Sequence, residues 1–167
     1  MKSAEVLAAL KKYHAATRSS THAWIFMKEL RLGTGWTHIN GINPEQRIDA
    51  WVLHSWPSSG FISVSYEVKV TRRDFKREIA KPEKRAGALR VSNYLYFAVP
   101  ERLVEPEEVP EEVGLVYVTE KGDVVIAKEA PWNKRDDNPT WALVASLCRS
   151  LLRGRQPVLM DGGEGAQ

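Results

Sequence analysis

Asp49, Glu67 and Lys69 are the residues whose types and spacing best suit chemistry. Glu67 and Lys69 lie two apart in Phe61–Val70, a run in which apolar and polar residues alternate. Such alternation predicts a strand, and side chains two apart on a strand share one face. Asp49 lies in the segment before it, Arg47–Leu53, which we expect to be the partner strand. The three side chains are therefore predicted to lie close together.

The connector between the two expected strands is short and rich in turn residues, Ser55–Gly60, which predicts an antiparallel hairpin. Residues opposite each other in such a pair are about 5 Å apart. Two carboxylates at that separation repel unless a proton or a cation lies between them. Hard cations such as Mg²⁺ or Mn²⁺ prefer carboxylate and carbonyl oxygens, so Asp49, Glu67 and the carbonyl of Val68 are the candidate metal ligands.

A lysine beside such a metal site suits one class of reaction. Lys69 can orient or help to deprotonate an attacking water, or offset the negative charge that grows on a phosphoryl group. The residues therefore favour metal-assisted hydrolysis of a phosphodiester. The competing interpretation is a ladder of surface ion pairs on a polar sheet face, without any catalytic task.

A basic segment follows directly after Lys69. Thr71–Asp74 matches a capping box, so a helix is predicted to start there. The segment from Lys69 to Arg90 has nine basic and three acidic residues, whereas Glu101–Glu112 has six Glu and one Arg. A basic face opposite an acidic one can orient a polyanion. The residues predicted to bind backbone phosphates are Arg72, Arg73, Lys76, Lys84 and Arg85.

Other segments supply the elements that must position these residues. We expect helices over Ser3–Ala16, from Ser20 or Thr21 through Trp24, Met27 and Leu30 to about Gly33, and from Asn138–Pro139 to Gly154, and strands over Tyr94–Val99, Leu115–Thr119 and Val124–Lys128. Tyr94–Val99 is almost wholly apolar, which is typical of a strand buried on both faces. Cys148 falls on the apolar stripe of the last helix and is expected in the core.

The bulk composition predicts one soluble domain over residues 1–154, with a Gly-rich tail over 155–167 that we expect to be disordered. The chain has 167 residues, a single cysteine, a net charge of +3 and a pI of about 9.0. We see no signal peptide and no apolar run that would span a bilayer, so we expect no membrane partner. The predicted location is the cytoplasm of a bacterial or phage-infected cell.

The order of these segments resembles the PD-(D/E)XK nuclease superfamily. The similarity rests on Arg47–Trp51 and Tyr66–Val70. Further similarity, to the MmcB-like DNA repair proteins and related phage-encoded nuclease-like proteins, covers Thr71–Phe75, Tyr96–Pro100, Val109–Pro110 and Gly114–Leu115. It implies an α/β fold with a mixed central sheet flanked by helices, a restriction-endonuclease-like core. Ile48 stands where the superfamily has its proline.

The resemblance also implies roles. Asp49 and Glu67 would bind the metal and Lys69 would assist the nucleophile. Glu29, expected on the preceding helix, matches the additional acidic residue that many members carry, although a solvated glutamate at a helix end is an equal alternative. The implied function is a Mg²⁺- or Mn²⁺-dependent deoxyribonuclease in DNA repair, recombination or phage DNA processing. Small nucleases of this kind often pair, so a homodimer stays open.

Two other functions remain alternatives. A non-catalytic DNA-binding module on a nuclease fold would use the same basic helix. A protein-interaction adaptor would use the acidic segment Glu101–Glu112 against a basic partner, although that segment is most simply a solvated connection.

Overall fold

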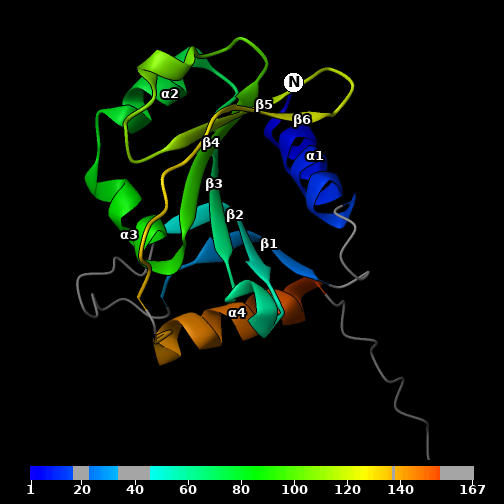
Figure 1. Ribbon diagram of the computed structural model, residues 1–167, viewed down its shortest axis with the longest axis vertical. Coiled ribbons are helices and arrows are strands. Elements are labelled where there is room, and N and C mark those ends of the chain that lie inside the picture. Colours follow the sequence, from blue (N-terminus) through cyan, green and yellow to red (C-terminus); the bar gives the residue numbers. More distant parts are fainter. Residues whose placement is uncertain (17–22, 34–45, 137, 155–167) are drawn as a thin grey trace, which may run out of the picture.

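The computed structural model describes residues 1–16, 23–33, 46–136 and 138–154. Within these ranges six strands form one mixed sheet with four helices around it, an α/β fold (Figure 1). The strands are β1 (Trp24–Arg31), β2 (Arg47–His54), β3 (Ser63–Val68), β4 (Tyr94–Pro100), β5 (Gly114–Val118) and β6 (Val124–Lys128). The helices are α1 (Ser3–Ala16), α2 (Arg72–Ile79), α3 (Glu83–Val91) and α4 (Trp141–Gly154).

The strands lie side by side in chain order, from β1 at one edge to β6 at the other. The pairs β1–β2, β2–β3 and β5–β6 are antiparallel, whereas β3–β4 and β4–β5 are parallel. The helices α2 and α3 form the crossover that parallel pairing of β3 and β4 requires. The sheet is therefore mixed, as the sequence predicts.

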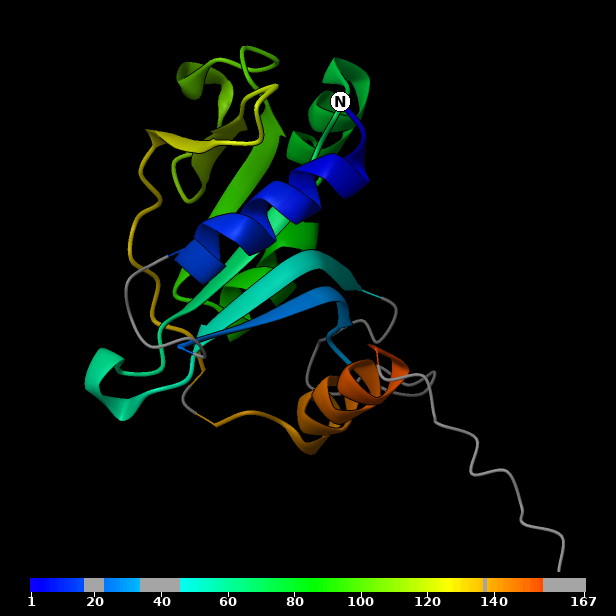
Figure 2. The ribbon, with the colours of Figure 1, turned by 90° about the vertical axis from the view of Figure 1, so that its right-hand side faces the viewer.

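Helices cover both faces of the sheet. Helix α1 runs across one face (Figure 2), where its Val6 and Leu10 are buried in the same apolar cluster as Tyr66 and Ala98. The opposite face carries a second apolar cluster, to which α2 contributes Phe75, α3 contributes Ala88 and α4 contributes Leu143. No helix in the described ranges is both long and apolar enough to cross a membrane.

Most of the expected elements are confirmed. The first helix has the predicted bounds, and the predicted hairpin forms, although β3 is shorter than Phe61–Val70. Thr71 caps α2 by accepting a hydrogen bond from the amide of Asp74 at 3.1 Å. Pro82 separates α2 from α3, and β4 is buried on both faces.

One element is wrong, because Trp24–Arg31 is a strand rather than a helix. Met27 and Leu30 both lie in the apolar cluster that includes Leu143 of α4, although residues three apart on a regular strand face opposite sides. Between them Glu29 takes a left-handed conformation, with φ 49°, which breaks the alternation. The three-residue spacing that imitates a helix thus comes from an irregular strand.

The C-terminal helix also differs in detail. Its cap is Thr140, whose hydroxyl accepts a hydrogen bond from the amide of Leu143 at 3.2 Å, so the helix begins at Trp141 and not at Asn138–Pro139. Cys148 is exposed rather than in the core, since it lies on the outer side of α4. The predicted tail, 155–167, lies outside the described residues.

Candidate metal and phosphate site

Asp49 lies where β2 and β3 separate. The paired residues run from Leu53 opposite Ser63 to Ala50 opposite Tyr66, and the ladder stops there. One step further, where the register would set Asp49 across from Glu67, the Oδ2 atom of Asp49 accepts a hydrogen bond from the backbone amide of Val68 at 2.8 Å. The carboxylate thus replaces a backbone acceptor in the ladder and opens a gap between the strands.

The backbone of Val68 also points into this gap. Its amide points toward Asp49, whereas the next amide, that of Lys69, points the other way and bonds the carbonyl of Ala98 at 3.1 Å. The N–H and C=O of one strand residue point to the same neighbouring strand. The carbonyl of Val68 therefore faces the gap that holds Asp49.

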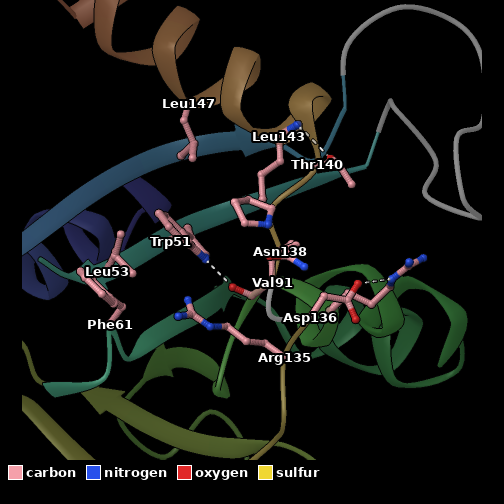
Figure 3. A pocket seen from close by; sticks show the side chains of 12 residues that line it. Trp51, Leu53, Phe61, Val91, Arg135, Asp136, Asn138, Thr140, Leu143 and Leu147 are labelled. Atoms are coloured by element: carbon pink, nitrogen blue, oxygen red, sulfur yellow. Dashed lines mark hydrogen bonds and ion pairs between the residues drawn. The ribbon is translucent and has the colours of Figure 1, made fainter. Parts of the chain in front are cut away.

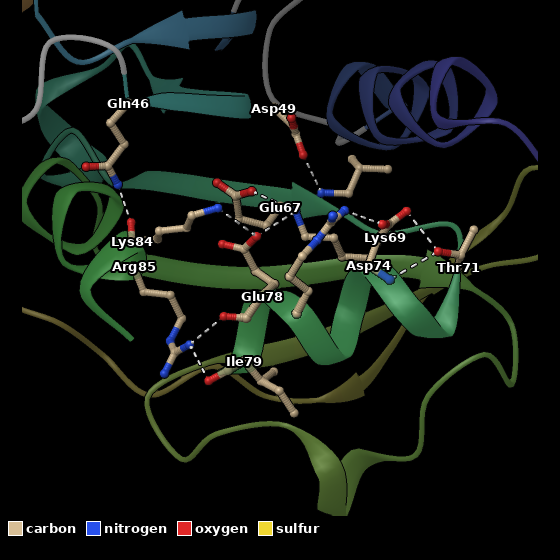
Figure 4. A network of polar contacts seen from close by, with 12 residues as sticks. Gln46, Asp49, Glu67, Lys69, Thr71, Asp74, Glu78, Ile79, Lys84 and Arg85 are labelled. Atoms are coloured by element: carbon tan, nitrogen blue, oxygen red, sulfur yellow. Dashed lines mark hydrogen bonds and ion pairs between the residues drawn. The ribbon is translucent and has the colours of Figure 1, made fainter. Parts of the chain in front are cut away.

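Lys69 lies between two carboxylates. Its Nζ atom is 3.3 Å from Oε2 of Glu67 and 3.3 Å from Oε2 of Glu78 on α2 (Figure 4). Lys84 on α3 approaches the same Glu78 oxygen at 3.7 Å. The side chains of Glu67, Lys69 and Glu78 are only 12–14% exposed, so the three groups form a largely buried ion cluster.

Burial and neighbouring charge shift the pKa values at this cluster. Burial raises the pKa of Glu67 to about 7, and the charge of Asp49 adds to this effect. Burial also raises the pKa of Asp49. Burial alone would lower the pKa of Lys69, but Glu67 and Glu78 hold it above its ordinary value. Lys69 is therefore charged at neutral pH, while Glu67 is close to its midpoint.

A cavity of about 470 Å³ opens beside the cluster, between the first turns of α1 and helix α2. It is lined by Ser3, Leu7, Glu29, Asp49, Val68, Lys69, Asp74, Arg77, Glu78 and Lys84. Four of these side chains are carboxylates and three are cations. With Glu67 next to Lys69, the site carries more carboxylates than cations, and an added cation would offset the excess.

Glu29 occupies a position that the sequence does not predict. It lies on β1, between residues that pair with Ala50 and Ile48, and so across from Asp49. Its side chain is 69% exposed, lies 3.6 Å from Arg47 and lines the cavity. The expected helix is absent, but the expected neighbourhood of Glu29 and Asp49 is present.

The residues fit a divalent cation only as a partial ligand set. Among the described residues no group of three His, Cys, Asp or Glu side chains is close enough to hold a metal ion. Asp49 and the Val68 carbonyl face one gap, and Glu67 lies beside Lys69. Mg²⁺ usually keeps several waters and is bound by one or two protein carboxylates. The small number of protein ligands at this site is therefore compatible with Mg²⁺.

The predicted phosphate-binding residues fall into two groups. Arg73 and Lys76 are exposed on α2, and Lys84 lies on the cavity wall. Arg72, by contrast, forms a two-pronged pair with Glu108 at 2.6 and 2.7 Å. Arg85 is 5% exposed and pairs with Glu112 at 2.8 Å. Two of the six glutamates of the acidic segment, Glu108 and Glu112, are therefore paired with the basic helices, and the other four are exposed.

The site residues predicted from the sequence do not include three charged residues of the cavity wall: Asp74, Arg77 and Glu78. Arg77 pairs with Asp74 at 2.6 Å, and its side chain is 67% exposed at the rim. A signal for them exists, because residues three and four apart lie on one helix face and the predicted start at Thr71 fixes which face follows Lys69. The helix start predicted from the capping box therefore also predicts that Glu78 lies on the same helix face as Asp74.

The chain shares its fold with a protein of solved structure. That protein, of unknown function, comes from Silicibacter pomeroyi; it superposes with a TM-score of 0.64 over 99% of this chain and 97% of its own, at 21% identity. Comparison with protein-family profiles and with curated proteins finds no match. These findings support the fold alone.

Proposed function

We propose that the protein is a Mg²⁺- or Mn²⁺-dependent nuclease that hydrolyses phosphodiester bonds in DNA. The observation that carries the proposal is the cavity where β2 and β3 separate, in which Asp49, the Val68 backbone and Lys69 share one wall beside Glu67. The order of α1, the antiparallel β1–β2–β3 unit, α2 and parallel β4 also supports the resemblance to PD-(D/E)XK nucleases.

Asp49, Glu67 and the carbonyl of Val68 are the residues that would hold the ion. A divalent ion at such a site supplies a more acidic water and polarises the phosphate. Glu67 is suited to this task because burial and the charge of Asp49 raise its pKa to about 7, and a cation between the two carboxylates would favour their ionised forms. Its contact with Lys69 is a single long one, at 3.3 Å, so an ion can replace it.

Lys69 acts on the phosphate. Glu78 holds the ammonium group at the cavity wall, and the pKa of Lys69 keeps it protonated at neutral pH. A fixed cation at this place stabilises the negative charge that develops on the phosphoryl oxygens during water attack. Arg77 and Lys84 on the wall, with Arg73 and Lys76 on the outer side of α2, would bind the flanking phosphates. Arg85 serves the fold instead, because its guanidinium is buried.

The test is a cleavage panel of linear, circular, single-stranded and branched DNA, each with Mg²⁺, with Mn²⁺ and without metal. We expect cleavage that needs metal and that falls at least a hundredfold in Asp49→Asn and Lys69→Met, consistent with loss of a charge that acts on the transition state. The matched control is Asp123→Asn, an exposed carboxylate in the β5–β6 turn. Absence of cleavage of every substrate in both metals contradicts the proposal.

A second candidate is a DNA-binding module without catalysis. It is favoured by the lack of a three-ligand group in the described residues and by the ion pairs that engage Lys69 on both sides. It predicts DNA binding that weakens steeply with salt, needs no metal and survives Asp49→Asn. The repair, recombination or phage context stays a prediction.

A further inference from the structure

A second cavity, of about 310 Å³, lies at the opposite end of the β2–β3 hairpin, where α4 crosses the sheet (Figure 3). Trp51, Leu53 and Phe61 from the hairpin form one wall, and Leu143 and Leu147 from α4 form another. None of the cavity's lining residues belongs to the site around Asp49. It is therefore a separate pocket, and the proposed hydrolysis leaves it without a task.

The size and walls of this cavity define the body of its ligand. Small-molecule pockets occupy about 300–1,000 Å³ and are mostly apolar with a few polar groups. An apolar cavity of roughly 150 Å³ accepts benzene, so one about twice as large suits two fused rings. The ring of Trp51 is held in place because its Nε1–H donates to the carbonyl of Val91 at 3.1 Å.

Arg135 defines the charge of the ligand. Its guanidinium extends toward the hairpin wall, where Nη1 donates to the hydroxyl of Ser63 at 3.0 Å (Figure 3). In the part of the chain that the structure describes, Arg135 has no carboxylate partner, whereas neighbouring Arg90 pairs with Asp136 at 3.2 Å. A guanidinium beside apolar walls and without an acid favours an anionic group such as a carboxylate.

The conformation of Phe61 points the same way. Its φ is 53°, a left-handed value that bulky residues rarely adopt, and 42% of its surface is exposed. Strained residues cluster at ligand clamps, where the strain holds a side chain in a required place. Here the strained backbone holds an aromatic ring against the cavity.

We propose that this cavity binds a small organic anion with a bicyclic aromatic body, the rings between Trp51, Phe61 and Leu147 and the anionic group on Arg135. The proposal is independent of nuclease activity. The anion makes a charge-assisted hydrogen bond to the guanidinium, while the rings displace water from the apolar walls. Recognition thus needs both parts of one molecule.

The experiment uses 2-naphthoate as the probe and 2-naphthylmethanol, with the same rings and no charge, as its matched comparison. Calorimetry on the full chain is expected to show one naphthoate site, in the millimolar range or tighter for so small a ligand, and at least tenfold weaker binding of the alcohol. In ¹H–¹⁵N spectra the indole signal of Trp51, assigned by its loss in Trp51→Phe, should shift on titration.

Two variants separate the parts of the site. Arg135→Gln is expected to weaken naphthoate at least tenfold and to change the alcohol by less than twofold, whereas Arg31→Gln, an exposed arginine on β1, changes neither. Leu147→Trp is expected to abolish the binding of both ligands. If this variant does not fold, the comparison of Arg135→Gln with Arg31→Gln decides the test alone. Equal binding of acid and alcohol, no saturable binding, or unchanged naphthoate affinity in Arg135→Gln would each overturn the proposal. Binding persists in Asp49→Asn even if the nuclease proposal fails.

Discussion

Replacing Glu67 with glutamine tests the electrostatics of the cluster. The side chain is 14% exposed, and burial together with the charge of Asp49 raises its pKa from 4.5 to about 7. In the unfolded chain the group ionises near 4.5, while in the folded chain it keeps its proton until about 7. Its contribution to stability is therefore fully present below pH 4.5 and is lost as the pH rises to 7.

The size of this effect follows from the two pKa values. A difference of about 2.5 pKa units corresponds to at most about 3.5 kcal/mol of unfolding free energy, at about 1.4 kcal/mol per unit. His14 acts in the opposite direction, because burial lowers its pKa from 6.5 to about 4 and the folded state loses stability as the pH falls between those values. The wild-type pH profile alone therefore hides the contribution of Glu67.

The assay compares urea unfolding of the wild type and Glu67→Gln between pH 4.5 and 8. His14 is common to both proteins, so it cancels in the difference. We expect the variant to gain about 2–3 kcal/mol relative to the wild type between pH 4.5 and pH 7.5. A difference that stays flat across this window, or that grows in favour of the wild type, would refute the electrostatic account of the cluster.

Three further predictions concern stability. Mn²⁺ at pH 7.5 should raise the unfolding temperature of the wild type but not of Glu67→Gln, in a thermal scan; equal shifts in both would place any bound ion elsewhere. Arg85→Ala should lose about 1–3 kcal/mol in urea unfolding, because it removes a buried side chain whose guanidinium pairs with the half-exposed Glu112, whereas loss of the exposed pair in Arg72→Ala should cost less than about 1 kcal/mol. Gly114→Ala should lose about 1–3 kcal/mol by the same measurement, since the added Cβ would overlap the ring of Tyr96 and lie 2.6 Å from the amide nitrogen of Ala130; a neutral result would show that β5 can shift.

Local patterns in the sequence account for much of the fold. The alternation in Phe61–Val70, the capping box at Thr71 and the apolar run Tyr94–Val99 each act over a few residues, and each element forms where its pattern predicts. Trp24–Arg31 could not be assigned correctly, because Met27 and Leu30 share a face only through the left-handed Glu29. Glu29 is the position of β1 that the pairing with β2 skips, and local spacing does not predict such an irregularity.

The site is predictable to the same extent. The hairpin spacing places Asp49, Glu67 and Lys69 together, since strand period and connector length determine register. The spacing does not predict that the Asp49 carboxylate accepts a hydrogen bond from the Val68 amide, next to the cavity. It also does not predict whether each arginine faces solvent, a phosphate or a carboxylate. Arg85 and Arg73 look alike in the sequence, yet only Arg85 is buried against Glu112.

The most direct test of the site is a titration with Mn²⁺, followed by the paramagnetic signal of the free ion. If Asp49 and Glu67 share a divalent ion, the wild type binds one Mn²⁺ per chain, Mg²⁺ competes for it, and Asp49→Asn and Glu67→Gln each lose the site. Asp123→Asn keeps it. Wild-type protein that leaves all Mn²⁺ free, or variants of Asp49 and Glu67 that bind it as the wild type does, would contradict the shared-ion site.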